Sequence, residues 1–393
     1  MSHLVLYRKY RPQTFAEIVG QEHIVQTLLT AIERGMISHA YLFSGPRGTG
    51  KTTIARLLAK SLNCENKDNL QYWAERKIEE SGSKGGWGST KKEPICNECS
   101  SCKEIMEGRS MDLIEIDAAS NRGIDEMREL REGARFAPSK SRYKVFIIDE
   151  AHQLTKEASN ALLKTLEEPP SHVIFILATT ELHKMLATIV SRCQRYDFRK
   201  LTMPELIGRL EILSKAENVK IEKDALELIA ANASGASRDA ESLLSQVLTV
   251  AATSQKETIK AENVRELLGI VNSRIVSQLI DFLGEKKTAQ ALDFLGKTLE
   301  KGCDPAQLSK ALLNYLRQAL VMKISPSSIN PDTSGLTKEE DEKLQSQIKM
   351  FEEKDITRIL KLFLEADNKI KYSPIPQLPL ELAIVEAGTS KAE

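Results

Sequence analysis

The sequence predicts an α/β domain with a five-stranded parallel sheet over residues 1–200, followed by two all-α domains. Short runs of apolar, β-branched or aromatic residues recur in this first part, and stretches with helical spacing separate them. Near-continuous apolar runs of this kind indicate parallel strands that are covered by helices on both faces. The strand pattern ends near residue 200, and only helical patterns follow it. The five predicted strands are 40–44, 113–117, 145–149, 173–177 and 195–198.

Two helices of the first domain have clear signals. Residues 53–62 place a set of apolar side chains on one face at helical spacing, namely Ile54, Leu57, Leu58 and Leu62. Residues 158–168 (ASNALLKTLEE) form the second helix. Pro169 and Pro170 end it, because proline lacks the backbone N–H that a helix needs.

The rest of the chain reads as helices. An all-α domain is predicted at 201–270, with helices at 205–217, 224–233, 238–252 and 261–268. A second all-α domain is predicted at 271–386, with a Pro/Ser/Asn-rich loop at 325–340, and a frayed tail at 387–393. Its helix at 355–371 is expected to turn one apolar face to the core, made of Ile356, Ile359, Leu360, Phe363 and Leu364.

Composition places the chain among globular proteins of two or three domains. Its 393 residues are 41% hydrophobic and 28% charged. No apolar run approaches the roughly 20 residues of a membrane span, and the first residues lack the apolar core of a signal peptide. We therefore expect a cytoplasmic protein with no membrane partner. Lys+Arg and Asp+Glu balance at 55 each, so binding to DNA would need a local basic surface.

Residues 45–52 read GPRGTGKT, a complete G-x-x-x-x-G-K-[ST] phosphate loop between a predicted strand and a predicted helix. Glycines let the backbone present its N–H groups to phosphate oxygens, and the following helix adds the partial positive charge of its N-terminus. Lys51 is expected to reach the β- and γ-phosphates, and the Thr52 hydroxyl to ligate Mg²⁺. The predicted ATP-binding residues here are Gly45, Pro46, Arg47, Gly48, Thr49, Gly50, Lys51, Thr52 and Thr53.

An acidic pair follows the strand at 145–149, as in a Walker B element. Asp149 is expected to support Mg²⁺, and Glu150 to orient or deprotonate the attacking water. Residues 149–152 also spell DEAH, the box of one helicase superfamily. Those helicases need a second core with an Arg-rich motif. The helical second half of this chain has no such core, so the helicase interpretation is disfavoured.

Three further positions could complete a site for ATP hydrolysis. Thr180, at the end of the fourth strand, could hold the attacking water, or it could serve a turn. Arg192 could stabilise the γ-phosphate of a neighbouring subunit in the transition state, or it could be a solvated surface residue. Arg238, in the first turn of a helix, could reach nucleotide at the domain junction, or it could pair with an acidic neighbour.

Four of the six cysteines form a candidate metal site between residues 64 and 102. Cys96, Cys99 and Cys102 have two overlapping C-x-x-C spacings, and Cys64 ends the helix after the phosphate loop. Four thiolates in a tetrahedral array suit Zn²⁺, and an iron–sulfur cluster is the alternative. A flexible insertion is expected at 82–90. The remaining two cysteines are expected to be ordinary buried residues, Cys193 and Cys303.

Together these motifs resemble AAA+ P-loop NTPases, and among them the gamma/tau family of clamp-loader subunits of bacterial DNA polymerase III. The helices after residue 244 resemble the family's oligomerisation collar more loosely. The matching segments, in the family's order, are YRKYRP at 7–12 with Phe15, VGQ at 19–21, GPRGTGKT at 45–52, DLIEIDAASNRGID at 112–125, DEAH at 149–152, NALLKTLEEPP at 160–170, LATT at 177–180, SRC at 191–193 and SRDAESLL at 237–244.

The resemblance implies an AAA+ ATPase domain at 1–200 with a zinc-binding insertion at 64–102, a helical lid at 201–270 and a helical collar at 271–386. Within the ATPase site, Lys51 and Thr52 bind phosphate and Mg²⁺, and Asp149 and Glu150 form Walker B. Thr180 takes the position called sensor 1.

Two arginines receive different roles from the resemblance. Arg192 is the arginine finger that acts on the adjacent subunit, and Arg238 is sensor 2, which acts on its own nucleotide. Arg11, Pro12 and Val19 border the adenine, although they could equally serve packing.

The family also carries a four-cysteine zinc module at this place. The gap between Cys64 and Cys96 is longer here than is usual in the family, which puts the participation of Cys64 in question.

The implied function is an ATP-driven motor that opens a sliding clamp and loads it on primed DNA. The expected partners are other clamp-loader subunits in a pentameric ring, the clamp, primer–template DNA and the DNA polymerase III core. Polymerase (nucleotidyltransferase) chemistry would belong to a partner subunit. DNA would be held through its backbone, with Ser120, Asn121 and Arg122 as candidates. The alternatives are a non-hydrolytic scaffold subunit and another AAA+ DNA-remodelling motor.

Overall fold

The computed structural model describes residues 5–66, 94–253, 258–268, 273–325 and 338–389. The chain forms two compact units, Met1–Thr258 (unit 1) and Ile259–Glu393 (unit 2), and each is described by itself. The insertion expected at 82–90 and most of the loop expected at 325–340 lie outside the described residues. Within the described residues, no helix combines the length and apolar character needed to cross a membrane.

Unit 1 contains the predicted five-stranded parallel sheet, in the order β2-β3-β4-β1-β5. All five predicted strands are confirmed, with ends that differ by at most two residues. The carboxyl ends of β1 and β4 meet where Ser44 pairs with Thr179, and those of β2 and β3 meet where Asp117 pairs with Asp149. The strands are β1 (Ala40–Ser44), β2 (Leu113–Asp117), β3 (Lys144–Asp149), β4 (Val173–Thr179) and β5 (Gln194–Asp197).

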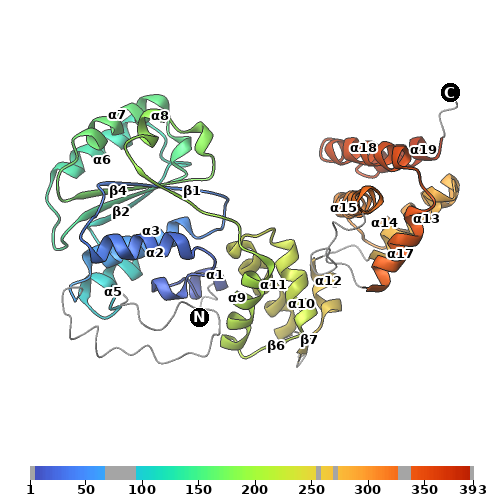
Figure 1. The fold of residues 1–393 in the computed structure, drawn as a ribbon, viewed down its shortest axis with the longest axis horizontal. Coiled ribbons are helices and arrows are strands. Elements are labelled where there is room, and N and C mark those ends of the chain that lie inside the picture. Colours follow the sequence, from blue (N-terminus) through green and yellow to red (C-terminus); the bar gives the residue numbers. More distant parts are fainter. Residues whose placement is uncertain (1–4, 67–93, 254–257, 269–272, 326–337, 390–393) are drawn as a thin grey trace. The chain divides into compact units, whose positions relative to one another are not determined.

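Helices cover both faces of this sheet (Figure 1). The first face carries α2 (Glu22–Glu33), α3 (Lys51–Asn63) and α5 (Ser100–Glu107), and the second carries α6 (Ile124–Arg135), α7 (Lys156–Glu167) and α8 (Ala187–Val190). Two shorter elements precede α2, namely α1 (Leu6–Lys9) and η1 (Phe15–Glu17). Two others follow β3 and β4, namely η2 (Ala151–Gln153) and η3 (Leu182–Lys184).

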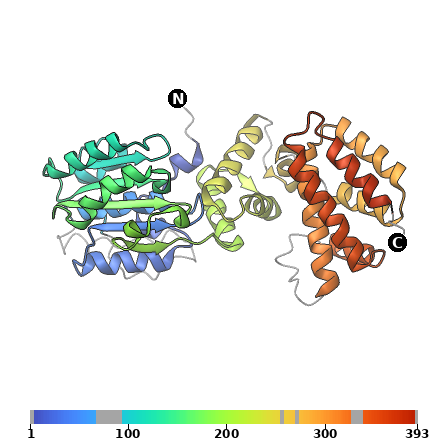
Figure 2. The same ribbon diagram turned by 90° about the horizontal axis from the view of Figure 1, so that it is seen from above.

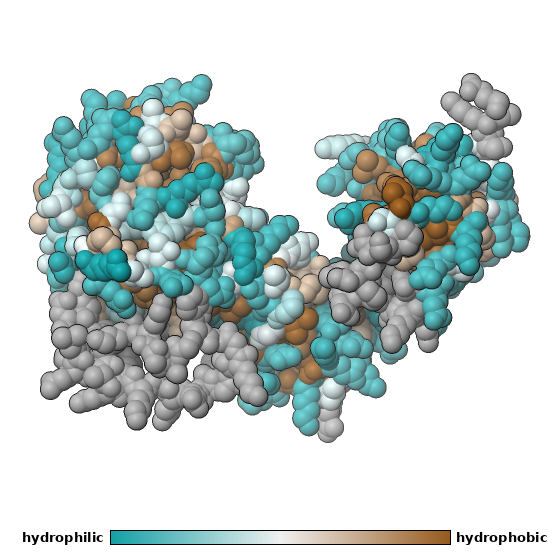
Figure 3. All heavy atoms as spheres, viewed as in Figure 1, coloured by the Kyte–Doolittle hydropathy of each residue, from teal (hydrophilic) through white to brown (hydrophobic). Residues whose placement is uncertain are grey.

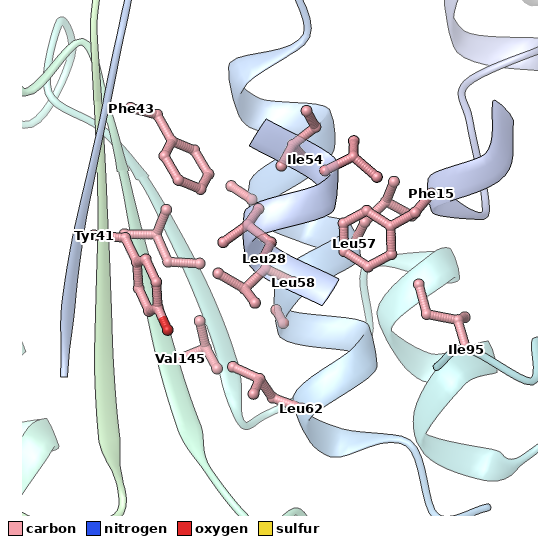
Figure 4. Packing of buried hydrophobic residues seen from close by; sticks show 14 of the residues in the cluster. Phe15, Leu28, Tyr41, Phe43, Ile54, Leu57, Leu58, Leu62, Ile95 and Val145 are labelled. Atoms are coloured by element: carbon pink, nitrogen blue, oxygen red, sulfur yellow. The ribbon is translucent and has the colours of Figure 1, made fainter. Parts of the chain in front are cut away.

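One hydrophobic core packs both the strand before the phosphate loop and the helix after it. All five residues of β1 are buried, and Tyr41 and Phe43 point toward Leu28 and Ile54 of the two helices (Figure 4). Apolar burial of such side chains contributes roughly 1.5–3 kcal/mol each. The strand before the loop and the helix after it are therefore held by one core.

Unit 1 also contains a helical part, made of α9 (Met203–Ala216), α10 (Lys223–Asn232) and α11 (Ser237–Thr253). These helices match three of the four predicted for the region 201–270, and the fourth, predicted at 261–268, is confirmed as α12 (Ala261–Leu268) of unit 2. The sequence pattern did not predict two short strands that pair with each other. β6 (Lys220–Ile221) lies between α9 and α10, and β7 (Thr258–Ile259) follows α11. The two units divide between Thr258 and Ile259, and the predicted boundary after residue 270 stays a prediction.

Apart from the turns and from Ile259 at the end of β7, the described residues of unit 2 are helical, and Figure 2 shows its helices side by side in orange and red. Its long helix α18 buries Ile356, Ile359 and Phe363, as predicted, but Leu364 is 53% exposed. The predicted face is wrong there, because the buried stripe continues through Ala366 at alternating steps of three and four residues. The helices are α12 (Ala261–Leu268), α13 (Ser273–Gly284), α14 (Thr288–Glu300), α15 (Pro305–Ile324), α17 (Lys338–Ile348), α18 (Glu353–Ile370) and α19 (Leu378–Gly388).

Unit 2 leaves several large apolar side chains exposed, and Figure 3 shows apolar surface in brown on this unit. Those on and near α18 and α19 are Leu364, Tyr372, Ile375, Leu378, Leu382 and Val385.

Candidate functional site

The phosphate loop lies at the carboxyl edge of the sheet, between β1 and α3. The Gly45 N–H donates to the Thr179 carbonyl at 3.2 Å, which ties the start of the loop to β4. Gly45 has a φ of +145°, and a Cβ built there would lie 2.4 Å from the Phe198 carbonyl oxygen. A side chain at this position would therefore clash with backbone.

Lys51 is the first residue of α3, and only 6% of it is exposed. Its Nζ donates to the carbonyl oxygens of Gly45 and Pro46, both at 2.8 Å, so the ammonium lies against the loop itself. Burial lowers the pKa of Lys51, and the nearby carboxylates of Glu150 and Asp149 oppose that shift. A lysine in this position can exchange carbonyl oxygens for phosphate oxygens without leaving the loop.

The structure brings Walker A and Walker B into direct contact. Thr52 Oγ1 donates to Asp149 Oδ2 at 2.8 Å, although the two residues are 97 positions apart in sequence. A hydroxyl and a carboxylate side by side are hard oxygen donors, which Mg²⁺ prefers together with phosphate oxygens and water. The residues present therefore fit the predicted magnesium site.

Glu150 takes a left-handed backbone conformation, with φ +48°, directly after β3. Its Oε2 accepts a hydrogen bond from Thr180 Oγ1 at 2.9 Å and lies 3.4 Å from His152 Nδ1. The structure thus brings the residues predicted as base and as sensor 1 into contact.

His152 was missed as a site residue by sequence reasoning. Its ring is almost buried, its Nδ1 lies 3.1 Å from Thr179 Oγ1, and its Nε2 lies 3.5 Å from Glu181 Oε2. The histidine of the DEAH string, next to the predicted base, was the available signal.

Arg238 lies near the loop through the first turn of α11. Its backbone N–H points to the Gly48 carbonyl at 3.4 Å, and a Cβ on Gly48 would lie 3.0 Å from the Ala236 side chain. The guanidinium of Arg238 lies over the Tyr7 ring, 4.7 Å from its centroid. The helical part of unit 1 therefore contacts the phosphate loop at its tip.

The residues predicted to border adenine belong to the segment after α1. Arg11 Nε donates to Thr53 Oγ1 at 3.4 Å, and burial lowers the pKa of Arg11 to about 10. Pro12 and Val19 are half-buried, and their place beside adenine stays a prediction.

Arg192 lies at the opposite edge of the sheet from the loop of its own chain. It precedes β5, whose first residue Gln194 pairs with Tyr41 near the amino end of β1. The rise of about 3.3 Å per strand residue separates the two edges by roughly 13 Å. The Arg192 guanidinium pairs with Glu167 at 2.6 Å and donates to the Thr188 carbonyl at 2.8 Å.

The structure also gathers the four predicted metal-binding cysteines. The sulfur atoms of Cys64, Cys96, Cys99 and Cys102 all lie within 4.8 Å of one another. Cys96 and Cys102 are 3.8 Å apart, close to the edge of about 3.8 Å in a tetrahedral site with Zn–S bonds of about 2.3 Å. Cys64 takes part despite the long gap in sequence.

Backbone N–H groups point at two of these sulfurs, as expected for thiolates. Cys96 Sγ accepts from the N–H groups of Glu98 and Cys99, and Cys99 Sγ accepts from that of Cys102. A hydrogen bond from Cys102 lowers the pKa of Cys64 to about 5, and the same contact raises the pKa of Cys102. The donor set and its spacing fit a structural zinc ion.

The two other cysteines, Cys193 and Cys303, are half-buried rather than buried as expected. Burial raises the pKa of Cys193 to about 12, which keeps its thiol protonated at neutral pH.

Three family models match the chain. "DNA polymerase III, delta subunit" matches residues 20–81 and 87–202, "DNA polymerase III clamp loader subunit, ATPase lid domain" matches 206–253, and "DNA polymerase III subunits gamma and tau domain III" matches 259–392. The Holliday junction branch migration motor RuvB of Thermotoga maritima, a solved structure, is 20% identical. The superposition covers 70% of this chain and 78% of the RuvB chain, with a TM-score of 0.48.

Curated relatives align over nearly the whole chain. DNA polymerase III subunit tau is 40% identical in Bacillus subtilis and 35% identical in Escherichia coli, each over 98% of this chain. The chain spans 63% and 55% of the length of these two relatives. DNA polymerase III subunit gamma of Buchnera aphidicola is 34% identical over 99% of both chains. These matches, on a chain with this phosphate loop and sheet, show that it belongs to the gamma/tau family of bacterial DNA polymerase III subunits.

Proposed function

We propose that this chain is an ATPase subunit of a bacterial clamp loader, which uses ATP to open a sliding clamp and load it on primed DNA. The observation that best supports ATPase activity is the contact between Thr52 and Asp149, because it joins the phosphate loop to the acidic strand. Lys51 lies in the same loop, and Glu150 follows Asp149 directly. All four residues needed for phosphate binding and for activation of water are intact.

The chemistry proposed is in-line attack of water on the γ-phosphate of ATP, which breaks the bond to the β-phosphate and yields ADP and phosphate. Lys51 and the loop N–H groups hold the phosphates, and Thr52 and Asp149 hold Mg²⁺. When bound, this ion neutralises phosphate charge. Glu150 orients the water and accepts its proton, while Thr180 keeps the Glu150 carboxylate in place through their 2.9 Å hydrogen bond.

Arg192 is proposed to act on the nucleotide of a neighbouring subunit. Its position at the opposite sheet edge from its own phosphate loop supports this role, since the side chain cannot serve both places. Its pairing with Glu167 on the surface keeps the guanidinium available for exchange onto a phosphate. Arg238, by contrast, is proposed to act on the nucleotide of its own subunit.

The proposed partners are other clamp-loader subunits in a pentameric ring, the sliding clamp, primer–template DNA and the DNA polymerase III core, which would supply the nucleotidyltransferase chemistry. Exposed apolar side chains on α18 and α19 support subunit contacts through unit 2. DNA would contact Ser120, Asn121 and Arg122 through its backbone. All three residues are exposed at the carboxyl edge of the sheet, after β2. The backbone N–H groups of Ser120 and Asn121 donate to the Asp117 carbonyl.

The cysteine cluster is proposed to bind one structural zinc ion. The ion would fix the end of α3, which carries Cys64, to the start of α5, which carries Cys99 and Cys102.

Steady-state ATP hydrolysis by the assembled complex tests the proposal, with and without clamp and primed DNA. Clamp plus primed DNA is expected to stimulate turnover, and Lys51→Ala is expected to abolish it. Unchanged turnover in Lys51→Ala would point instead to a non-hydrolytic scaffold. Stimulation by Holliday junctions in place of clamp and primed DNA would point to another remodelling motor.

A further inference from the structure

Arg209, in the middle of α9, is a buried cation that none of the predicted site motifs contains. It is 9% exposed, and its guanidinium has partners on two other elements. Its Nε donates to Glu241 Oε1 on α11 at 2.9 Å, and its Nη2 donates to the backbone carbonyl of Tyr10 at 2.7 Å. One side chain thus joins α9, α11 and the N-terminal segment.

Both ends of this link lie next to residues proposed to handle the nucleotide. Glu241 is 5% exposed and follows Arg238 by three residues on α11. Its Oε1 also accepts from Ser237 Oγ at 3.2 Å, which is in the same first turn as Arg238. The other end, Tyr10, directly precedes Arg11, which contacts Thr53 of α3.

Two neighbouring contacts also join the N-terminal segment to the helical part of unit 1. The Tyr7 ring lies against the Arg238 guanidinium, and Lys9 Nζ pairs with Glu217 Oε1 at the end of α9 at 2.7 Å. These two contacts are more exposed than the Arg209 link, so they contribute less. Among these three polar contacts, the Arg209 link between the N-terminal segment and the helical part of unit 1 is the most buried.

We propose that Arg209 and Glu241 are positioning residues that couple the N-terminal nucleotide-binding segment to Arg238. The inference rests on the proposed ATPase function. The link fixes the first turn of α11 relative to Tyr10, so that a nucleotide held by the Arg11 segment also meets Arg238 at the right place. Neither residue touches the nucleotide itself.

The chemistry of the link explains why an arginine occupies position 209. A guanidinium carries several N–H groups in a rigid plane, so it can serve a carboxylate and a carbonyl that lie in different directions. A lysine keeps the charge opposite Glu241 but offers a single flexible ammonium. Removing Arg209 alone would leave the Glu241 carboxylate buried and unpaired, which destabilises the fold for an unrelated reason.

The test therefore replaces both partners with apolar residues of similar size, Arg209→Met with Glu241→Leu. Such a replacement of a buried ion pair is often close to neutral for stability. ATP and ADP affinities of the full chain are measured with fluorescent nucleotide analogues, and thermal unfolding is followed in parallel. The matched control is Lys223→Met with Glu227→Leu, an exposed ion pair on α10 of the same helical part.

The double variant is expected to bind ATP about tenfold more weakly, within the usual range for coupling between sites. Its preference for ATP over ADP is expected to fall to that of Arg238→Ala, and adding Arg238→Ala to it should cause no further loss. Arg209→Lys is expected to lie between the double variant and the unchanged chain, and the α10 control should match the unchanged chain.

Unchanged nucleotide affinity and unchanged ATP preference in a folded double variant would overturn the inference while leaving the proposed function intact. A lower unfolding temperature with the same ATP preference would overturn it as well, because the pair would then be merely structural. If the double variant does not fold, the ATP and ADP affinities of Arg209→Lys provide the test instead. Absence of ATP binding by the unchanged chain would overturn the proposed function, and this inference with it.

Discussion

Glu150 is held at the catalytic edge by its backbone as well as by its side-chain partners. A non-glycine residue with φ +48° costs of order 1–3 kcal/mol, and such strain persists where the surroundings enforce it. The Glu150 carboxylate in turn contacts the Thr180 hydroxyl and the ring of His152. These two contacts hold the Glu150 carboxylate in one orientation.

Replacing Thr180 by valine keeps the shape of the side chain and removes the hydroxyl that holds Glu150. Turnover is expected to fall about 100-fold, in the range for a mispositioned general base, while ATP affinity stays unchanged. The measurement is kcat for the assembled complex together with the ATP dissociation constant. A loss of affinity with normal kcat would show that Thr180 serves binding instead.

At the scale of single elements, the start of α9 is stabilised by a charged cap. Glu205 Oε2 accepts from the Thr202 backbone N–H at 2.8 Å, and its carboxylate pairs with Arg199 at 2.6 Å. The contact with Arg199 lowers the pKa of Glu205 to about 2, from an ordinary value of 4.5. A carboxylate with a depressed pKa contributes stability above its unfolded pKa, and this contribution is lost as the pH falls through the folded value.

Glu205→Gln is therefore expected to lower the free energy of unfolding by about 1 kcal/mol at pH 7. The difference from the unchanged chain should shrink between pH 4.5 and pH 2, because the wild-type carboxylate becomes neutral in that window. Urea unfolding of both chains at a series of pH values measures this difference in the free energy of unfolding. A difference that grows toward low pH would contradict the assignment.

The cysteine cluster also acts at the scale of single elements, since it joins the end of α3 to the start of α5. Purified chain is expected to carry about one zinc ion, and Cys99→Ser or chelation should lower the unfolding temperature. Cys303→Ser is the matched control, because Cys303 lies in unit 2 and should change neither metal content nor stability. Less than about half an equivalent of zinc per chain, or iron in its place, would refute the zinc assignment.

At the scale of the whole molecule, the sheet separates two parts of the proposed chemistry. The loop that binds ATP follows the carboxyl end of β1, and Arg192 precedes the amino end of β5. A complete site would therefore need two subunits. In the proposed function, hydrolysis therefore depends on assembly.

Mixtures of two inactive variants test this dependence. Arg192→Ala and Lys51→Ala subunits are each expected to lack turnover, and mixing them should restore part of it wherever an intact arginine faces an intact loop. The rescue is measured as ATP turnover of complexes reassembled at varied ratios. No rescue at any ratio would place Arg192 outside the neighbour's site.

Most of the sheet followed from sequence because its central strands β1, β3 and β4 are short buried runs, such as Val145–Asp149, whose apolar pattern is local. The buried face of α18 was harder to predict, since Leu364 fits the helical period as well as Ala366 does, and only packing against α15 and α19 selects between them. His152 had a signal in the DEAH string. Arg209 had none, because its partner Tyr10 is 199 residues away.

The sequence by itself determined the five strands of the sheet and the phosphate-loop motif, because a phosphate loop such as 45–52 and an acidic strand end are encoded by neighbouring residues. Only the tertiary structure decided which distant groups meet. Cys64 joins the other three cysteines across a long insertion, and Arg209 connects Tyr10 with Glu241. These contacts depend on how buried faces pack, and packing is a property of the whole core, which no local stretch of sequence specifies.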